Sequence, residues 1–92
     1  MKDSLFVKSR FDNIATEERP RTPESIQIHN AKLQILGWIY NEGELRPEEE
    51  LRIQLRNCTE EIMGYELMNV TGVSLDVVKA RKYELELILE DI

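Results

Sequence analysis

Residues 46–65 read RPEEELRIQLRNCTEEIMGY and carry the strongest helix signal in the chain. Pro47 suits the first helical position, where its missing N–H costs nothing, and the three acids after it favour the positive end of a helix dipole. Gly64 and a recapping signal at 59–61 also allow two shorter helices broken near Asn57. We predict a helix because the apolar side chains step by four and three: Leu51, Leu55, Cys58, Ile62 and Tyr65.

The segment before this stretch has the same kind of signals. Thr22 is a hydroxyl cap, and Pro23 suits the first helical position. We predict a helix that begins here and ends near Asn41, with Gly43 supplying the left-handed residue that closes such an end. The apolar side chains have helical spacing: Ile28, Ala31, Ile35, Leu36, Ile39 and Tyr40.

A third helix is expected from Leu75 to Ile92. Thr71-Gly72 predicts a turn, and Ser74 is a suitable cap. The first two helices should pack antiparallel because a short loop joins them, and the third should cover them. The predicted fold is all-α, a small bundle of three to four helices. The stripe of the third helix is Val78, Leu85, Ile88, Leu89 and Ile92.

Three stretches also alternate apolar and polar residues, which is typical of strands. They are residues 26–29, 51–56 and 83–87. An α+β fold is therefore the alternative. We favour helices because Ala, Lys, Arg, Glu and Leu dominate these segments and the caps are in register with them.

Residues 1–21 lack a sustained helical period and are predicted to form a mobile N-terminal arm, whereas 22–92 form the helical domain. The arm is richer in basic residues than the rest of the chain. Its apolar side chains suit either of two roles, docking on a partner or covering the small core of the domain itself. They are Leu5, Phe6, Val7, Phe11 and Ile14.

The composition restricts the function. The chain has 92 residues with 12 Lys and Arg against 18 Asp and Glu, a formal charge of −6. This acidity disfavours non-specific attraction to nucleic acid or to an anionic membrane. A domain of this size has a small core, and self-association is one way to stabilise it. We therefore expect a homodimer or another homo-oligomer.

Chemistry-bearing residues are sparse. A single cysteine, Cys58, allows no disulfide within the chain, and a single histidine, His29, allows no cluster of zinc ligands. No run approaches the roughly 18 apolar residues of a membrane span, and the N-terminus lacks the apolar stretch of a signal peptide. We expect a cytoplasmic protein that is not an enzyme, with no cofactor, metal site or membrane contact.

Residues 66–81 read ELMNVTGVSLDVVKAR, and this segment resembles the helix-turn-helix of bacterial transcription regulators. Gly72 matches the glycine of the turn in that family, and Ser74 matches the cap of its recognition helix. Met68 departs from the pattern, because alanine is usual where the two helices approach. The resemblance covers residues 66–82 and implies two kinds of DNA contact: Ser74, Asp76 and Val77 toward base edges, with Lys79, Arg81 and Lys82 toward phosphates.

The sequence favours a small interaction or regulatory protein that uses an acidic helical surface to bind a protein partner. DNA binding through residues 66–82 is the alternative. Aromatic side chains often anchor such partners. The candidates here are Phe6 and Phe11 in the arm, and Trp38 and Tyr40 at the end of the first predicted helix.

Overall fold

The computed structural model describes residues 1–17 and 19–90. Within these residues the fold is all-α, as predicted, with four helices and a two-stranded hairpin. The elements in chain order are α1 (Ser4–Thr16), α2 (Pro23–Ile39), β1 (Tyr40–Asn41), β2 (Glu44–Leu45), α3 (Glu48–Leu67) and α4 (Val73–Leu89).

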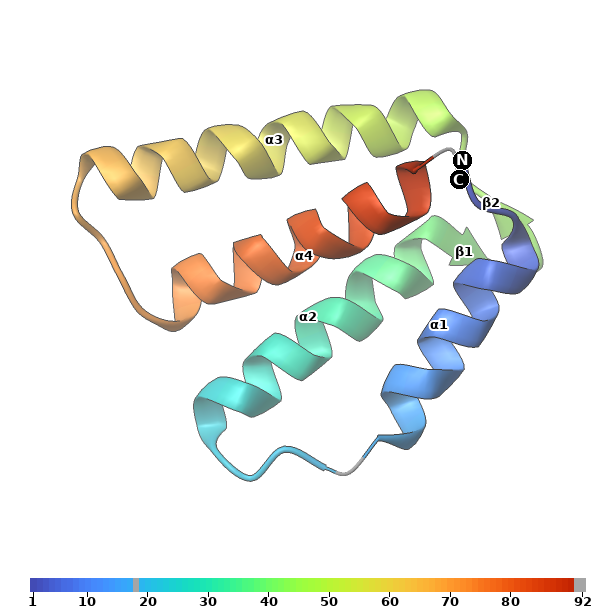
Figure 1. Ribbon diagram of the computed structural model, residues 1–92, viewed down its shortest axis with the longest axis horizontal. Helices are drawn as coiled ribbons and strands as arrows, with labels where there is room; N and C mark the ends of the chain where they lie inside the picture. The colour runs from blue at the N-terminus through green and yellow to red at the C-terminus, as the bar shows by residue number, and fades with distance from the viewer. Residues whose placement is uncertain (18, 91–92) are drawn as a thin grey trace.

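Helix α4 is the centre of the bundle. It lies between α3 and α2, and α1 lies at the outer edge beside α2 (Figure 1). This corrects the expectation that α2 and α3 pack on each other with α4 as a cover, because both pack mainly on α4. The buried side chains of α4 are correspondingly numerous: Leu75, Val78, Ala80, Glu84, Leu85, Ile88 and Leu89.

Helix α2 begins as predicted. The Thr22 hydroxyl accepts a hydrogen bond from the Ser25 backbone N–H at 3.1 Å. The Ser25 hydroxyl oxygen in turn accepts one from the Thr22 backbone N–H at 3.2 Å. The helix ends at Ile39, and a hairpin follows in which Tyr40 pairs with Leu45.

Gly43 has a different role from the predicted one. Instead of closing α2, it forms the two-residue turn of the hairpin together with Glu42. The φ angles of Glu42 and Gly43 are 53° and 83°. Two consecutive positive φ angles are what the tight hairpin turn of type I′ requires.

Helix α3 is unbroken from Glu48 to Leu67, so the alternative of two shorter helices near Asn57 is wrong. Residues 51–56 and 83–87 lie inside α3 and α4, and 26–29 lie inside α2. The strand alternative is therefore wrong for all three segments. Their alternating apolar side chains fall partly on exposed faces, as with Ile53, which is 43% exposed.

Helix α4 has a different cap from the predicted one. Gly72 is the N-cap residue, with φ 114° and ψ −163°, a backbone region that is essentially restricted to glycine. Ser74 is an exposed residue of the first turn. The helix ends at Leu89, and Ile92 of the predicted stripe lies outside the described residues.

The largest correction concerns residues 1–21. Within them, α1 extends from Ser4 to Thr16 and begins where the Asp3 carboxylate accepts a hydrogen bond from the Phe6 N–H at 2.9 Å. Val7 and Ile14 are buried in the same core as α2, α3 and α4. The helical period escaped detection because these two residues, seven apart, are the only fully buried ones in α1.

Candidate interaction site

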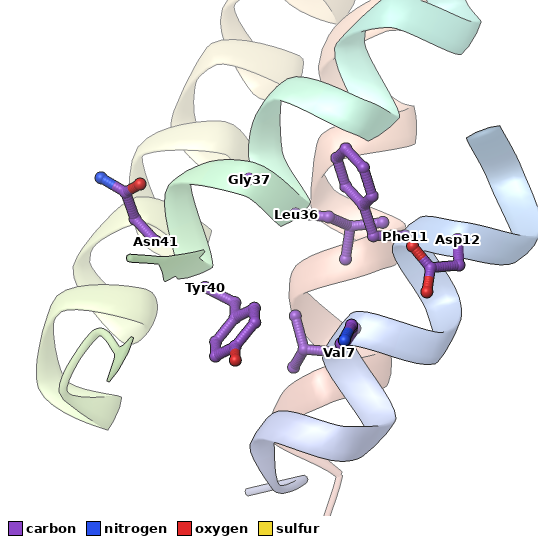
Figure 2. Close-up of a pocket in the computed structure, with 8 residues that line it drawn as sticks. Val7, Phe11, Asp12, Leu36, Gly37, Tyr40 and Asn41 are labelled. Carbon is purple, nitrogen blue, oxygen red and sulfur yellow. The ribbon is translucent and has the colours of Figure 1, made fainter. Parts of the chain in front are cut away.

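A pocket of about 310 Å³ opens between α1 and the end of α2 (Figure 2). We call it the α1–α2 pocket. Val7 and Tyr40 lie on opposite sides of the space in Figure 2, and Phe11 lies between the two helices. The volume is at the lower end of the range typical of ligand sites. Its lining residues are Val7, Lys8, Phe11, Asp12, Leu36, Gly37, Tyr40 and Asn41.

The floor and walls of the pocket are apolar. Val7 and Leu36 are fully buried, whereas Phe11 and Tyr40 are half-buried and keep part of each ring accessible. Gly37 leaves the space open because it has no side chain. A Cβ atom added there would lie 3.8 Å from Cε2 of Phe11, an ordinary van der Waals contact. A larger residue at this position would therefore enter the pocket without straining the backbone.

The rim of the pocket carries opposite charges. Lys8 and Asp12 are exposed and stand one turn apart on α1. Among the described residues neither forms an ion pair or a cation–π contact. Both charged groups are thus available to a molecule that covers the pocket.

An acidic surface lies next to the pocket. The two are connected by strand β1 of the hairpin, because its residues Tyr40 and Asn41 also line the pocket. Two arginines offset part of this charge, since Arg46 lies 3.5 Å from a carboxylate oxygen of Glu50 and Arg52 lies 3.3 Å from one of Glu48. The exposed acids of the hairpin and the start of α3 are Glu42, Glu44, Glu48, Glu49 and Glu50.

Trp38 lies apart from the α1–α2 pocket. The Arg46 guanidinium stacks 4.5 Å from the Trp38 ring centroid and donates a hydrogen bond from Nε to the Trp38 carbonyl oxygen at 2.7 Å. The indole lines shallow depressions with Gln54 of α3 and Arg81 of α4. The Trp38 side chain is half-buried.

The four predicted anchor residues are thus divided. Phe11 and Tyr40 share one pocket, and Trp38 lies in a separate depression. Phe6 packs against the core, with Lys2 Nζ 5.5 Å from its ring centroid. Spacing along the chain could not reveal the Phe11–Tyr40 pair, because it depends on how α1 docks on α2.

The residues predicted to contact DNA have different surroundings. Arg81 lines the depression beside Trp38, and Lys82 lies 3.7 Å from a carboxylate oxygen of Glu86. Lys79 is exposed and lies one turn before Lys82 on the same side of the helix, about 200° around the helix from Arg81. Ser74 and Asp76 are exposed in the first turn of α4, and Val77 is half-buried.

The helices that flank the turn also differ from the family pattern. α3 and α4 lie side by side and run in opposite directions along their length (Figure 1). In a helix-turn-helix the two helices cross at about 90–120°. Met68 is not squeezed between them, since it lies in the turn and is 74% exposed.

A buried ion pair between α1 and α4 was not predicted. Arg10 donates from Nε and Nη2 to the two carboxylate oxygens of Glu84 at 2.6 and 2.9 Å. The Glu84 side chain is completely buried, and that of Arg10 is 28% exposed. The hydrogen bonds that Arg10 donates to Glu84 raise the pKa of Arg10 above its ordinary value. The pair therefore fixes α1 on the centre of the bundle.

Cys58 is a buried residue of the core, as predicted. Burial is the main cause that raises the pKa of its thiol, with a smaller contribution from the Glu61 carboxylate. In the part of the chain that is described, no group of three or more His, Cys, Asp or Glu could hold a metal ion. No helix there is both long enough and apolar enough to cross a membrane.

Comparison of the chain with models of protein families, with curated proteins and with solved structures found no match.

Proposed function

We propose that the chain is a non-enzymatic interaction protein that binds a protein partner through the α1–α2 pocket. The observation that carries this proposal is an accessible apolar pocket lined by two aromatic rings, with uncommitted charges on its rim. Protein interfaces are commonly anchored by large side chains that enter such pockets. A volume of about 310 Å³ has room for one such side chain.

The charges around the pocket define the chemistry of the partner. The acidic hairpin beside Tyr40 would attract a Lys or Arg side chain of the partner. Lys8, on the α1 side of the pocket, would attract an acidic side chain. We therefore propose a partner segment with a large apolar residue flanked by at least one basic residue. Complementary charge of this kind affects the association rate and the specificity more than the affinity.

Filling the pocket tests this proposal. Gly37→Leu places a side chain in the space beside Phe11, and the helix gains propensity because an interior glycine is removed. Gly64→Leu is the matched control, because Gly64 is also an interior helical glycine and has nothing within 4 Å of an added Cβ. Peptides selected from a displayed random library on the wild-type protein would then be titrated against both variants.

The expected outcome is a set of peptides that share a large apolar residue with a neighbouring Lys or Arg. Gly37→Leu should weaken their binding about tenfold or more, which corresponds to about 1.4 kcal/mol, while Gly64→Leu leaves it unchanged. Circular dichroism checks that both variants remain helical. A library that yields no binder, or peptides that bind Gly37→Leu as well as wild type, would count against the proposal.

DNA binding through residues 66–82 stays a prediction. No observation favours it, because only Lys79 and Lys82 share one side of α4, Lys82 pairs with Glu86, and Arg81 lies beside Trp38. A cytoplasmic location also stays a prediction from the sequence. It can be checked by fractionating the native cells and probing each fraction for the chain.

A further inference from the structure

An exposed face of α1 has a regular pattern that the core of the bundle does not use. Leu5, Lys8, Asp12 and Ala15 are all exposed and step by three, four and three, so they form one stripe along the helix. Leu5 is 70% exposed. Lys8 and Asp12 border the α1–α2 pocket and Ala15 borders a second hollow between the same two helices, so the stripe lies outside the core on the side of α1 that adjoins α2.

The stripe is complementary to itself. If two copies of α1 pack antiparallel about a two-fold axis, each residue of one copy lies opposite a residue of the other at an equal distance from the axis. Each contact therefore occurs twice. With the axis midway between positions 8 and 12, Lys8 of one copy meets Asp12 of the other. The same register places Leu5 opposite Ala15. Lys8 and Asp12, which form no ion pair among the described residues, thus pair with each other across the axis.

The apolar ends of the stripe also match. Ala15 lies at the edge of a second hollow, of about 390 Å³, between α1 and α2, where Ile26 and Leu33 contribute apolar surface. In the antiparallel register the exposed Leu5 of one copy would reach this hollow in the other. An exposed side chain and the apolar part of the hollow are therefore both covered, twice, by one symmetric contact.

We propose that a second copy of this chain covers α1, in an antiparallel contact with two Lys8–Asp12 ion pairs and with Leu5 beside Ala15. A helix of 13 residues is about 20 Å long, so the contact is small and the dimer is expected to be weak. This inference goes beyond the proposed function. Lys8 and Asp12 border the α1–α2 pocket, so a second copy and a partner in the pocket would compete for these two residues, and the two tests must be separable.

Charge reversal with rescue is the decisive experiment. Lys8→Asp alone, or Asp12→Lys alone, replaces two attractions by two repulsions across the axis. The double variant Lys8→Asp with Asp12→Lys restores both pairs in reversed order. Lys79→Asp is the control, because it makes the same charge change on the exposed face of α4. The dimer dissociation constant is measured by sedimentation equilibrium at low ionic strength.

The expected result is a wild-type dimer whose dissociation constant rises about tenfold or more in each single variant, because two weak attractions are lost and two weak repulsions are gained. The dissociation constant of the double variant should return to within about threefold of the wild-type value, and that of Lys79→Asp should stay within the same range. A wild-type protein that is monomeric at every concentration would overturn the inference. So would a double variant that is not rescued.

Crosslinking tests the register separately. In a Cys58→Ala background, a mixture of Leu5→Cys and Ala15→Cys chains should form a disulfide-linked heterodimer under mild oxidation. Either chain alone should crosslink much less, and equal crosslinking in all three samples would contradict the register. Gly37→Leu should not change the dissociation constant of the dimer. If the pocket test succeeds and the protein is monomeric, the proposed function stands and only the second copy is rejected.

Discussion

At the scale of single residues, the pair of Arg10 and Glu84 shows what spacing along the chain cannot reveal. Glu84 looks like one of several surface acids of α4, yet its carboxylate is completely buried and its partner is 74 positions away. Helical period locates a residue on a face, but only the docking of α1 supplies the guanidinium. The burial of Cys58, in contrast, could be predicted because it lies in the apolar stripe of its own helix.

Truncating either member of this pair should have unequal effects. Arg10→Met leaves the Glu84 carboxylate buried without a partner and should lower the free energy of unfolding by about 3 kcal/mol, the order found when one member of a buried pair is removed. Glu84→Leu should cost about 1 kcal/mol, because the freed Arg10 side chain, 28% exposed, can turn to water. Urea denaturation measures both values.

The double variant completes the test. With both charges replaced by apolar groups, the free energy of unfolding should return close to that of the wild type. Equal losses in the two single variants, or a double variant whose loss is their sum, would contradict the buried geometry. Lys82→Met is the control, because Lys82 and Glu86 form an exposed pair whose removal should cost less than about 0.5 kcal/mol.

At the scale of elements, α2 and α3 could be predicted because their own sequences contain clear helix signals. A proline at each start, helical spacing and acids in the first turn were sufficient for α2 and α3. Helix α1 was missed because it buries only Val7 and Ile14. It is held in place by packing on α2 and by the ion pair between Arg10 and Glu84 of α4. The hairpin was missed because Gly43 serves equally well as a helix end and as a turn.

This difference between elements predicts their relative opening. Helix α4 buries seven side chains and contacts both α2 and α3, whereas α1 buries two at the edge of the bundle. Amide hydrogen exchange in α1 should therefore be at least about tenfold faster than in α4, because regions with few buried contacts open at lower free energy. Mass spectrometry of peptides from 4–16 and 75–89 measures the ratio.

The same measurement can be repeated on Arg10→Met. Exchange in α1 should accelerate further because the ion pair to α4 is lost. Equal protection of α1 and α4 in the wild type would mean that α1 opens only with the whole bundle, and the description of α1 as the less stable element would be wrong.

At the scale of the whole molecule, the docking of α1 creates the candidate surfaces. The α1–α2 pocket and the exposed stripe of α1 both depend on it, so neither could be derived from the sequence of one element. The sequence was nevertheless sufficient to select the aromatic residues as candidate anchors. Phe11 and Tyr40 were selected as anchors for their type, and the fold brings them together from separate elements.

The distribution of charge over the molecule leads to the last prediction, which concerns duplex DNA. The formal charge is −6, and the three basic side chains of α4 do not form one patch: Lys79 and Lys82 are one turn apart, but Lys82 pairs with Glu86 and Arg81 lines the depression beside Trp38. Binding to phosphate requires clustered cations and weakens steeply with salt as counterions are released. Fluorescence anisotropy with a mixed-sequence duplex should therefore give a dissociation constant weaker than about 10⁻⁴ M at moderate salt. Tighter binding with a steep salt dependence, lost in Lys79→Glu, would instead favour the regulator hypothesis. It would require α4 to meet the groove through its Lys79 face, where Asp76 and Glu86 stand one to two turns away, and Asp76→Asn should then strengthen the binding.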